Sequence, residues 1–322
     1  MNRPNRSEII RGTVTLALLL TVAFSGVRAA VRTLSEAKSW VITVRSPKAV
    51  DNRGQADAAE IQAMLEQGLR ALSGKATAGE AWMTLGLKPK DIVGVKINCN
   101  NWTINLSPQP ELVAVLADSL SSVVPLNNIV FYDMHKADLE QAGFKRNATK
   151  NGVRFLAAET DARYDDREKL TEIATSLCTK LINFASLKTV YEPDADEPYE
   201  ASLHFKNQIG SLTAEDAPKC HDDADFLAAI LARPSIRQKT ILNLCTGLRA
   251  SYKRGVPWYW GGIILGVDPL ATEYVALQVI NEKRTLEKAK PLGLSPYLTI
   301  AETKYGLGSC LPEKIEWVRL ER

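Results

Sequence analysis

The feature that most constrains this sequence is a repeated alternation between short apolar runs and stretches with helical spacing. Residues 91–99, DIVGVKINC, alternate so regularly that their apolar side chains share one face and leave Lys96 and Asn98 on the other. Further apolar runs predict strands at 40–44, 128–132, 153–157, 180–184, 240–244, 263–267 and 314–320. Helical spacing, or a proline that can open a helix, predicts helices at 57–72, 110–120, 226–232 and 269–281. This order is typical of an α/β fold whose mostly parallel sheet is covered by helices on both faces, in one domain or two lobes.

The first thirty residues have the three-part layout of a cleavable secretory leader. Arg3, Arg6 and Arg11 precede an apolar run at 13–24, and small residues before Ala29 suit cleavage after that alanine. A membrane-spanning helix needs about 20 apolar residues, more than this run provides, although an uncleaved anchor or a buried helix remains the alternative. We therefore expect an exported protein, periplasmic or extracellular, in which residues 30–322 form a single domain without stable membrane insertion.

Charge limits the partners that this chain can have. The predicted leader holds four of the 40 basic residues and one of the 37 acidic residues, so the remainder balances at 36 of each. A chain without net charge lacks the excess of basic residues that binding to nucleic acids or anionic membranes requires, so neither is expected as a partner. The sequence also contains no Gly-rich nucleotide fingerprint, no H-E-x-x-H and no G-x-S-x-G, which argues against common hydrolases and dinucleotide enzymes.

The five cysteines, at positions 99, 178, 220, 245 and 310, include no C-x-x-C pair. Their number and spacing match neither a disulfide framework nor a zinc or iron–sulfur signature. Export would allow one or two disulfides, but most of these cysteines are expected to be buried, small apolar side chains.

Polar side chains follow several of the predicted strands. Parallel sheets bind ligands beyond the carboxyl ends of their strands, where loops and helix starts converge. The residues at these ends are Asn98, Asn100, Asp133, His135, Lys188, Thr246 and Asp268. A second polar group lies between them in the chain, formed by His204, Lys206, Asn207, His221, Asp222 and Asp223. We expect the lysines and acids of both groups to converge in one crevice at the rim of the sheet.

Several of these residues also have a purely structural explanation. Lys96 could extend from an edge strand to solvent, Asp133 could belong to a turn, and Asp268 before Pro269 could cap the following helix. The run Cys-His-Asp-Asp at 220–223 offers mixed metal ligands. Adjacent side chains seldom face one ion, however, so a solvated loop is favoured, and neither a metal nor a cofactor is assigned.

Taken together, several segments resemble the domain-of-unknown-function 362 family in its exported bacterial branch. They follow in order over about residues 38 to 320, at 88–99 (KPKDIVGVKINC), 110–113, 129–133, 139–144 (LEQAGF), 181–188 (LINFASLK), 203–210 (LHFKNQIG), 221–222, 263–271 (IILGVDPLA) and 282–284. The resemblance implies an α/β domain of unsettled activity. It marks Lys96, Asn98, Asp133, Lys188, Lys206, Asn207, His221, Asp222 and Asp268. Some relatives carry a ferredoxin-type iron–sulfur segment, which this chain lacks.

The chain departs from the family pattern where imidazoles and carboxylates are usual. Relatives tend to show Lys-Asp-His where this chain has Lys188-Thr189-Val190, Asp where it has Thr246 and Glu273, and His where it has Gln109. These departures remove groups suited to proton transfer or metal ligation.

Two functions therefore stay open. In the first, an enzyme or cofactor-handling protein binds an anionic small molecule, such as a phosphate or carboxylate, through ammonium and amide donors. The ligand-binding candidates are Lys96, Asn98, Asp133, Asn207 and Asp268, and the catalytic candidates are Lys188, Lys206, His221 and Asp222. His221, held by Asp222 or another carboxylate, would be the acid or base. In the second, a non-catalytic binding or assembly protein keeps the scaffold after losing its active-site groups.

Overall fold

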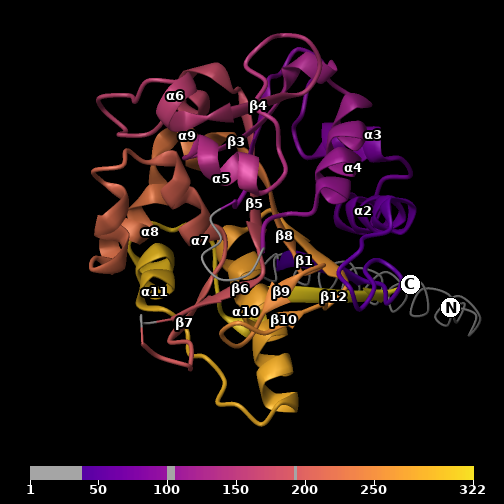
Figure 1. Ribbon diagram of the computed structural model, residues 1–322, viewed down its shortest axis with the longest axis vertical. Coiled ribbons are helices and arrows are strands. Elements are labelled where there is room, and N and C mark those ends of the chain that lie inside the picture. The colour runs from indigo at the N-terminus through magenta and orange to yellow at the C-terminus, as the bar shows by residue number, and fades with distance from the viewer. Residues whose placement is uncertain (1–37, 100–105, 192–193) are drawn as a thin grey trace, which may run out of the picture. The chain divides into compact units, whose positions relative to one another are not determined.

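An eight-stranded sheet of order β12-β1-β11-β8-β5-β2-β3-β4 forms the centre of the fold (Figure 1). Its strands are β1 (Ser39–Arg45), β2 (Val93–Lys96), β3 (Ile129–Asp133), β4 (Arg154–Ala157), β5 (Lys180–Ser186), β8 (Thr240–Thr246), β11 (Gly262–Gly266) and β12 (Ile315–Glu321). Among these eight strands, β11 is antiparallel to its neighbours β8 and β1, while the other neighbouring pairs are parallel. The predicted α/β fold with a mostly parallel sheet is therefore confirmed.

This computed structural model describes residues 38–99, 106–191 and 194–322. The predicted leader at 1–29, its cleavage site and Asn100 lie outside the described residues. Residues 39–322 form one unit. None of the helices in the described ranges combines the length and apolarity that crossing a bilayer would require.

Helices cover both faces of the sheet because side chains alternate along each strand. On one face, α2 (Ala58–Ser73), α3 (Ala78–Thr84) and α4 (Pro110–Ser121) pack against strand residues such as Val93 and Val95. On the other face lie α8 (Ala224–Ala232), α10 (Pro269–Leu286) and α11 (Pro296–Thr303), which pack against residues such as Val130 and Ile264. In Figure 1, α2, α3 and α4 lie to the right of the strands, and α8 and α11 lie to the left.

The ends of α2 illustrate how local sequence sets the predicted boundaries. Asp57 caps its start by accepting the backbone N–H of Glu60 at 3.0 Å. Gly74 ends it in the left-handed conformation, with φ at 69°, and donates its N–H to the Arg70 carbonyl. The helix therefore begins and ends within one residue of the predicted range 57–72.

The chain order reverses between β2 and β5. Strands β2, β3 and β4 succeed one another toward one edge, whereas β5 lies on the other side of β2 and β8 continues away from it. The connections that leave the carboxyl ends of β2 and β5 therefore diverge. Open α/β sheets bind their ligands at such switch points.

Short elements cluster beyond these carboxyl ends. Two ribbons pair there, β6 (Lys188–Val190) with β7 (Glu200–Ser202) and β9 (Ala250–Ser251) with β10 (Pro257–Trp258). A single-turn helix, α7 (His204–Asn207), is followed directly by the 3₁₀ segment η3 (Gln208–Ser211) and later by the 3₁₀ segment η4 (Ala217–His221).

The described chain has further short elements. They are the helices α5 (Lys136–Gln141), α6 (Ala158–Asp161) and α9 (Pro234–Lys239), the π-helical turn η2 (Ile173–Leu177), and the 3₁₀ turns η1 (Leu126–Asn128) and η5 (Pro312–Lys314). Apolar periodicity could not predict elements this short.

Candidate functional site

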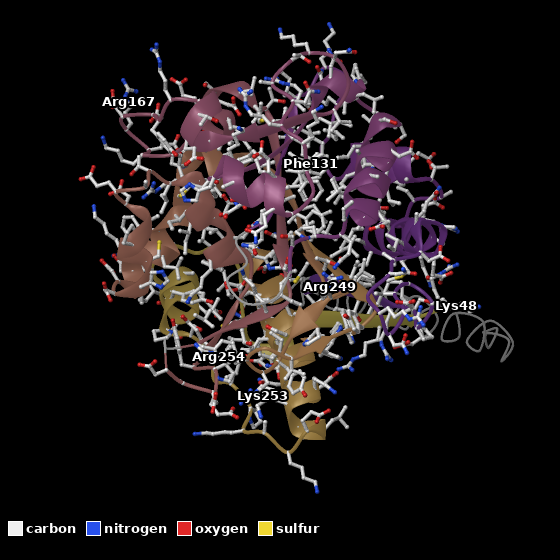
Figure 2. All side chains as sticks on the ribbon, in the orientation of Figure 1. Lys48, Phe131, Arg167, Arg249, Lys253 and Arg254 are labelled. Carbon is white, nitrogen blue, oxygen red and sulfur yellow. The ribbon has the colours of Figure 1, made fainter. Side chains whose placement is uncertain are left out.

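A cavity of about 900 Å³ opens at the carboxyl end of the sheet, where β2, β3 and β5 meet the short elements. Its wall includes the cationic residues Lys96, Lys188, Lys206, Lys253 and Arg254 and the acidic residues Asp133 and Asp138. Lys253 and Arg254 come from the turn between β9 and β10, where Figure 2 labels them. Most of the remaining wall is apolar, with Leu106, Met134, Val190, Ile209 and Pro218 among its residues.

The predicted site residues divide into a group that lines this cavity and a group that does not. Lys96, Asn98, Asp133, Lys188, Lys206, Asn207 and His221 all line it. The three lysines Lys96, Lys188 and Lys206 therefore line the same cavity. Asp222 and Asp268 are not among the lining residues.

Lys96 and Asp133 form a buried ion pair at the ends of β2 and β3. The ammonium nitrogen of Lys96 lies 2.6 Å from Oδ1 of Asp133, and it also donates to the carbonyl of Ile97. Asp133 accepts the backbone N–H groups of Cys99 at 2.7 Å and of Met134 at 2.8 Å. Lys96 is thus a buried residue on a central strand, not the edge lysine that the sequence left as an alternative.

Asn207 joins this pair to the helix α7. Its amide nitrogen donates to the Lys96 carbonyl at 2.9 Å and to Oδ1 of Asn183 at 2.8 Å, while its amide oxygen accepts from Lys96 at 3.2 Å. Asn183 can take part because it lies beside Lys96 in the β2–β5 register. It donates in turn to the His204 carbonyl at 3.0 Å. These bonds fix α7 over the sheet and hold one wall of the cavity.

Gly210 allows that wall to approach so closely. A Cβ atom at this position would lie 2.5 Å from Oδ1 of Asp133 and 2.5 Å from Cε of Lys96. Only a residue without a side chain fits above the ion pair at this distance.

Lys188 enters the cavity from β6. Its ammonium nitrogen donates to the amide oxygen of Asn98 at 2.7 Å. Burial lowers the pKa of Lys188 to about 8, and the nearby cations of Lys96 and Lys206 act in the same direction, against the opposing effect of Asp133. Lys188 therefore titrates closer to neutrality than an ordinary lysine does.

Lys206 belongs to α7 and is ion-paired with Glu200 of β7. The other carboxylate oxygen of Glu200 accepts the hydroxyl of Ser295 at 2.9 Å, and the Lys206 ammonium lies 5.5 Å from the centre of the Tyr199 ring. This pairing compensates the charge of Lys206, as Asp133 compensates that of Lys96.

His135 is held by a carboxylate, in a pair that the sequence did not reveal. Its Nδ1 lies 2.7 Å from Oε2 of Glu159, whose other oxygen accepts the backbone N–H of Lys136 at 2.8 Å. Burial alone would raise the pKa of Glu159, but the hydrogen bonds from His135 and Lys136 outweigh it and lower that pKa. Because His135 lines the cavity, this pair gives the site an imidazole with a fixed orientation.

Asp138 is a lining residue that sequence reasoning missed. Burial raises its pKa above the ordinary value, the Asp133 carboxylate raises it further, and His135 opposes the shift. It lies in the first turn of α5, where an acidic residue is expected on helical grounds alone. Nothing in the sequence distinguished it from an ordinary helix residue.

The predicted pair of His221 and Asp222 lies at the surface. Both residues are exposed, and the imidazole of His221 lines the cavity while Asp222 does not. In the part of the chain that the structure describes, it is His135, not His221, that joins a carboxylate at the cavity.

Asp268 lies at the other end of the strands from the cavity, toward the amino end of β8. Strand β11 begins beside the carboxyl end of β8 and runs toward its amino end, with Ile263 opposite Thr246 and Gly266 opposite Asn243. Asp268 therefore caps α10, accepting the N–H groups of Leu270 at 2.9 Å and Ala271 at 3.0 Å. The expectation that Asp268 follows a strand at the carboxyl end of the sheet is wrong, because β11 is antiparallel to β8. The structure agrees with the capping alternative, and a ligand-binding role for Asp268 stays a prediction.

The positions that depart from the family pattern have structural partners. Glu273 is buried in α10, where it accepts the backbone N–H of His204 at 2.7 Å and the hydroxyl of Tyr297 at 3.0 Å. Thr246 donates to Gln109 at 3.5 Å beside the carboxyl end of β8. Glu273 therefore holds the first residue of α7, His204, in place.

The cysteines and possible metal ligands add no further group. All five cysteines lie within the described residues, where they are buried, as most were expected to be, and form no disulfide with one another. No cluster of three or more histidine, cysteine, aspartate or glutamate side chains that could hold a metal ion occurs in the described part of the chain.

Comparison with known proteins gives no relative. No family model matches the chain, and no curated protein or solved structure does so either. The resemblance to the domain-of-unknown-function 362 family stays a prediction from the sequence.

Proposed function

We propose that this protein binds a small organic anion in the cavity at the carboxyl end of the sheet, as an enzyme or a cofactor-handling protein. The observation that carries the proposal is the charge of the wall, which includes four lysines and one arginine against two aspartates. An excess of one sign of charge on a wall that is otherwise largely apolar attracts ligands of the opposite charge.

The wall also suggests the shape of that ligand. Ammonium and guanidinium groups satisfy the oxygens of a carboxylate or phosphate. The apolar residues between them, such as Met134, Val190 and Ile209, suit a hydrocarbon or aromatic body. The anion is therefore proposed to have one charged end and one apolar end.

Calorimetric titration tests this proposal with matched probes. Benzoate and phenyl phosphate are expected to bind, and benzamide, which has nearly the shape of benzoate without its charge, is not. Loss of a hydrogen bond to a charged group costs about 1.5–3 kcal/mol, so Lys188→Met and Lys206→Met should each weaken binding at least about tenfold.

Lys90→Met is the control variant, because Lys90 is exposed and precedes β2 at the amino edge of the sheet. It is expected to bind the probes like the unaltered protein. Equal affinity in both cavity variants and the control would overturn the proposal.

We further propose that residues 1–29 direct export, as the layout of the leader predicts. The measurement is the intact mass of protein recovered from a culture of a bacterial expression host. A mature chain beginning at Ala30 in the periplasm or medium supports export, and full-length protein confined to the cytoplasm contradicts it.

A further inference from the structure

We propose that this cavity hydrolyses phosphate monoesters, with His135 as the nucleophile, Glu159 as the residue that positions it and Asp138 as the general acid. This inference rests on the proposed anion binding, names a phosphate monoester as the anion and adds a reaction. Water is the co-reactant, and the products are inorganic phosphate and the free alcohol.

The sheet brings His135 and Glu159 together. Strands β3 and β4 are parallel neighbours, with Asp133 opposite Ala157, and His135 and Glu159 each lie two residues beyond that pair. The backbone N–H of Glu159 donates to the Met134 carbonyl at 3.1 Å, which ties the two strand ends together. Oε2 of Glu159 then lies 2.7 Å from Nδ1 of His135. The backbone therefore positions both members of this pair.

The contact with Glu159 decides which ring nitrogen of His135 can react. An ionised carboxylate only accepts hydrogen bonds, so the proton of the neutral imidazole is on Nδ1 and the lone pair is on Nε2. The side chain of His135 is 42% exposed and lines the cavity, so a ligand can reach it. Histidine is one of the side chains that form covalent intermediates, and a group that orients the imidazole supports this role.

Asp138 is placed to act as the acid. It lies three residues after His135, in the first turn of α5, and lines the same cavity. Burial raises the pKa of Asp138, the carboxylates of Asp133 and Glu159 raise it further, and His135 and Lys96 oppose the shift. Burial would raise the pKa of Glu159 as well, but its hydrogen bonds outweigh burial and lower it. Carboxyl groups whose pKa values are shifted in opposite directions are suited to opposite roles.

The cations of the wall favour a phosphoryl group. A phosphate monoester carries about two negative charges at neutral pH, and Lys188, Lys206, Lys253 and Arg254 line the same cavity as His135. Transfer of a phosphoryl group needs little from a protein beyond positioning and cations that stabilise the phosphoryl oxygens. The apolar residues of the wall accommodate the alcohol.

The proposed reaction consists of two displacements and balances without an oxidant or a reductant. Nε2 of His135 bonds to phosphorus, the bond from phosphorus to the ester oxygen breaks, and Asp138 gives that oxygen its proton. The oxygen of a water molecule then bonds to phosphorus and a proton of that water passes to Asp138, while the phosphorus–nitrogen bond breaks. Inorganic phosphate leaves, and both side chains return to their starting states.

Turnover of phenyl phosphate by the full chain tests the proposal. Phenol and inorganic phosphate should be released, and rapid denaturation in alkali, in which phosphohistidine survives, should trap a phosphorylated chain. Its mass should exceed that of the unreacted chain by one phosphoryl group, on the peptide that contains His135. Phenylphosphonate, which has a carbon–phosphorus bond in place of the ester bond, should bind and inhibit without reacting.

Substitution of the nucleophile gives the sharpest result. His135→Gln should lose both turnover and the phosphorylated chain, while it still binds phenylphosphonate. Turnover that persists in this variant, or that is lost instead in His221→Gln, would overturn the inference.

Two esters distinguish an acid from a structural residue at Asp138. Asp138→Asn should slow hydrolysis of phenyl phosphate by about a hundredfold or more. It should slow hydrolysis of para-nitrophenyl phosphate far less, because nitrophenolate leaves without a proton. Glu140→Gln is the control and should keep both rates, since Glu140 is an exposed carboxylate of the same helix that does not line the cavity. Equal slowing of both esters in Asp138→Asn would overturn the role of Asp138.

The role of Glu159 is tested by separating kcat from KM. Glu159→Gln should lower kcat for phenyl phosphate without raising KM, because the carboxylate orients the imidazole and does not hold the phosphate. A raised KM with unchanged kcat would overturn this positioning role.

Calorimetry on the same samples separates this inference from the proposed function. Binding of phenylphosphonate without turnover of either ester would overturn the hydrolysis and leave anion binding intact. No binding of phenylphosphonate, benzoate or phenyl phosphate would overturn both.

Discussion

Lys96 and Asp133 lie 2.6 Å apart as a buried ion pair that joins the carboxyl ends of two neighbouring parallel strands. Asp133 also accepts the backbone N–H of Cys99, two residues beyond Ile97, whose carbonyl accepts from Lys96. The pair therefore fixes the path of the chain as it leaves β2. This is the path that carries Asn98 to Lys188.

Replacing Lys96 by methionine should destabilise the fold strongly. The apolar side chain leaves the Asp133 carboxylate buried without its cation, which costs about 3–5 kcal/mol. Urea unfolding measures the change. The double variant Lys96→Met with Asp133→Leu should recover part of the loss, since it buries no charge. A single variant within about 0.5 kcal/mol of the unaltered protein, the range of ordinary surface substitutions, would contradict a buried pair.

Gly210→Ala should disturb the same pair from the opposite side. The added methyl would lie 2.5 Å from both Oδ1 of Asp133 and Cε of Lys96. Overpacking of this kind costs about 1–3 kcal/mol. Gly293→Ala is the control, because nothing lies within 4 Å of a Cβ atom there. Equal unfolding midpoints for the two variants would show that α7 and η3 can move away from the sheet.

Asp268→Ala should separate stability from binding. Loss of the cap on α10 costs about 1–2 kcal/mol, measured by thermal or urea unfolding. Affinity for benzoate should not change, because Asp268 lies at the other end of the strands from the cavity. A weaker affinity in this variant, at a temperature where it is fully folded, would argue for the ligand-binding role that the sequence first suggested.

The protonation of Lys188 makes stability depend on pH in a defined window. Its pKa falls from 10.5 to about 8 on folding. Between these values the unfolded chain binds a proton that the folded protein does not, so this residue's contribution to the free energy of unfolding rises with pH.

Denaturant unfolding of the unaltered protein and of Lys188→Met, at about pH 7 and about pH 10, isolates this contribution from other titrating groups. The free energy of unfolding of the unaltered protein should rise relative to that of the variant. A constant difference would mean that Lys188 has the same pKa in both states.

Much of the sheet could be predicted because each strand has its own run or alternation of apolar residues. The alternation at 91–99 placed Val93 and Val95 on one face and Lys96 on the other, as the structure has them. The direction of β11 could not be predicted. A short, fully apolar strand has the same pattern in either direction, and Asp268 was misplaced for that reason.

Site residues that directly follow a strand could be predicted. Contacts between residues far apart in the sequence could not. Asn98 and Asp133 come directly after apolar runs, so their position at the rim followed from the fold class. His135 and Glu159 are 24 residues apart and meet only because β3 and β4 are neighbours. Lys253 and Arg254 lie on a turn between two-residue strands, too short for any periodicity to show.

The pairing of β12 with β1 bears on how the chain folds. The strand nearest the start of the described chain lies between β11 and β12, two of the last strands to be made. That edge of the sheet cannot assemble before the chain has been made as far as β12, at residues 315–321. Contacts between segments so far apart in sequence slow folding, and removal of the last eight residues would leave β1 as an unpaired edge, open to aggregation.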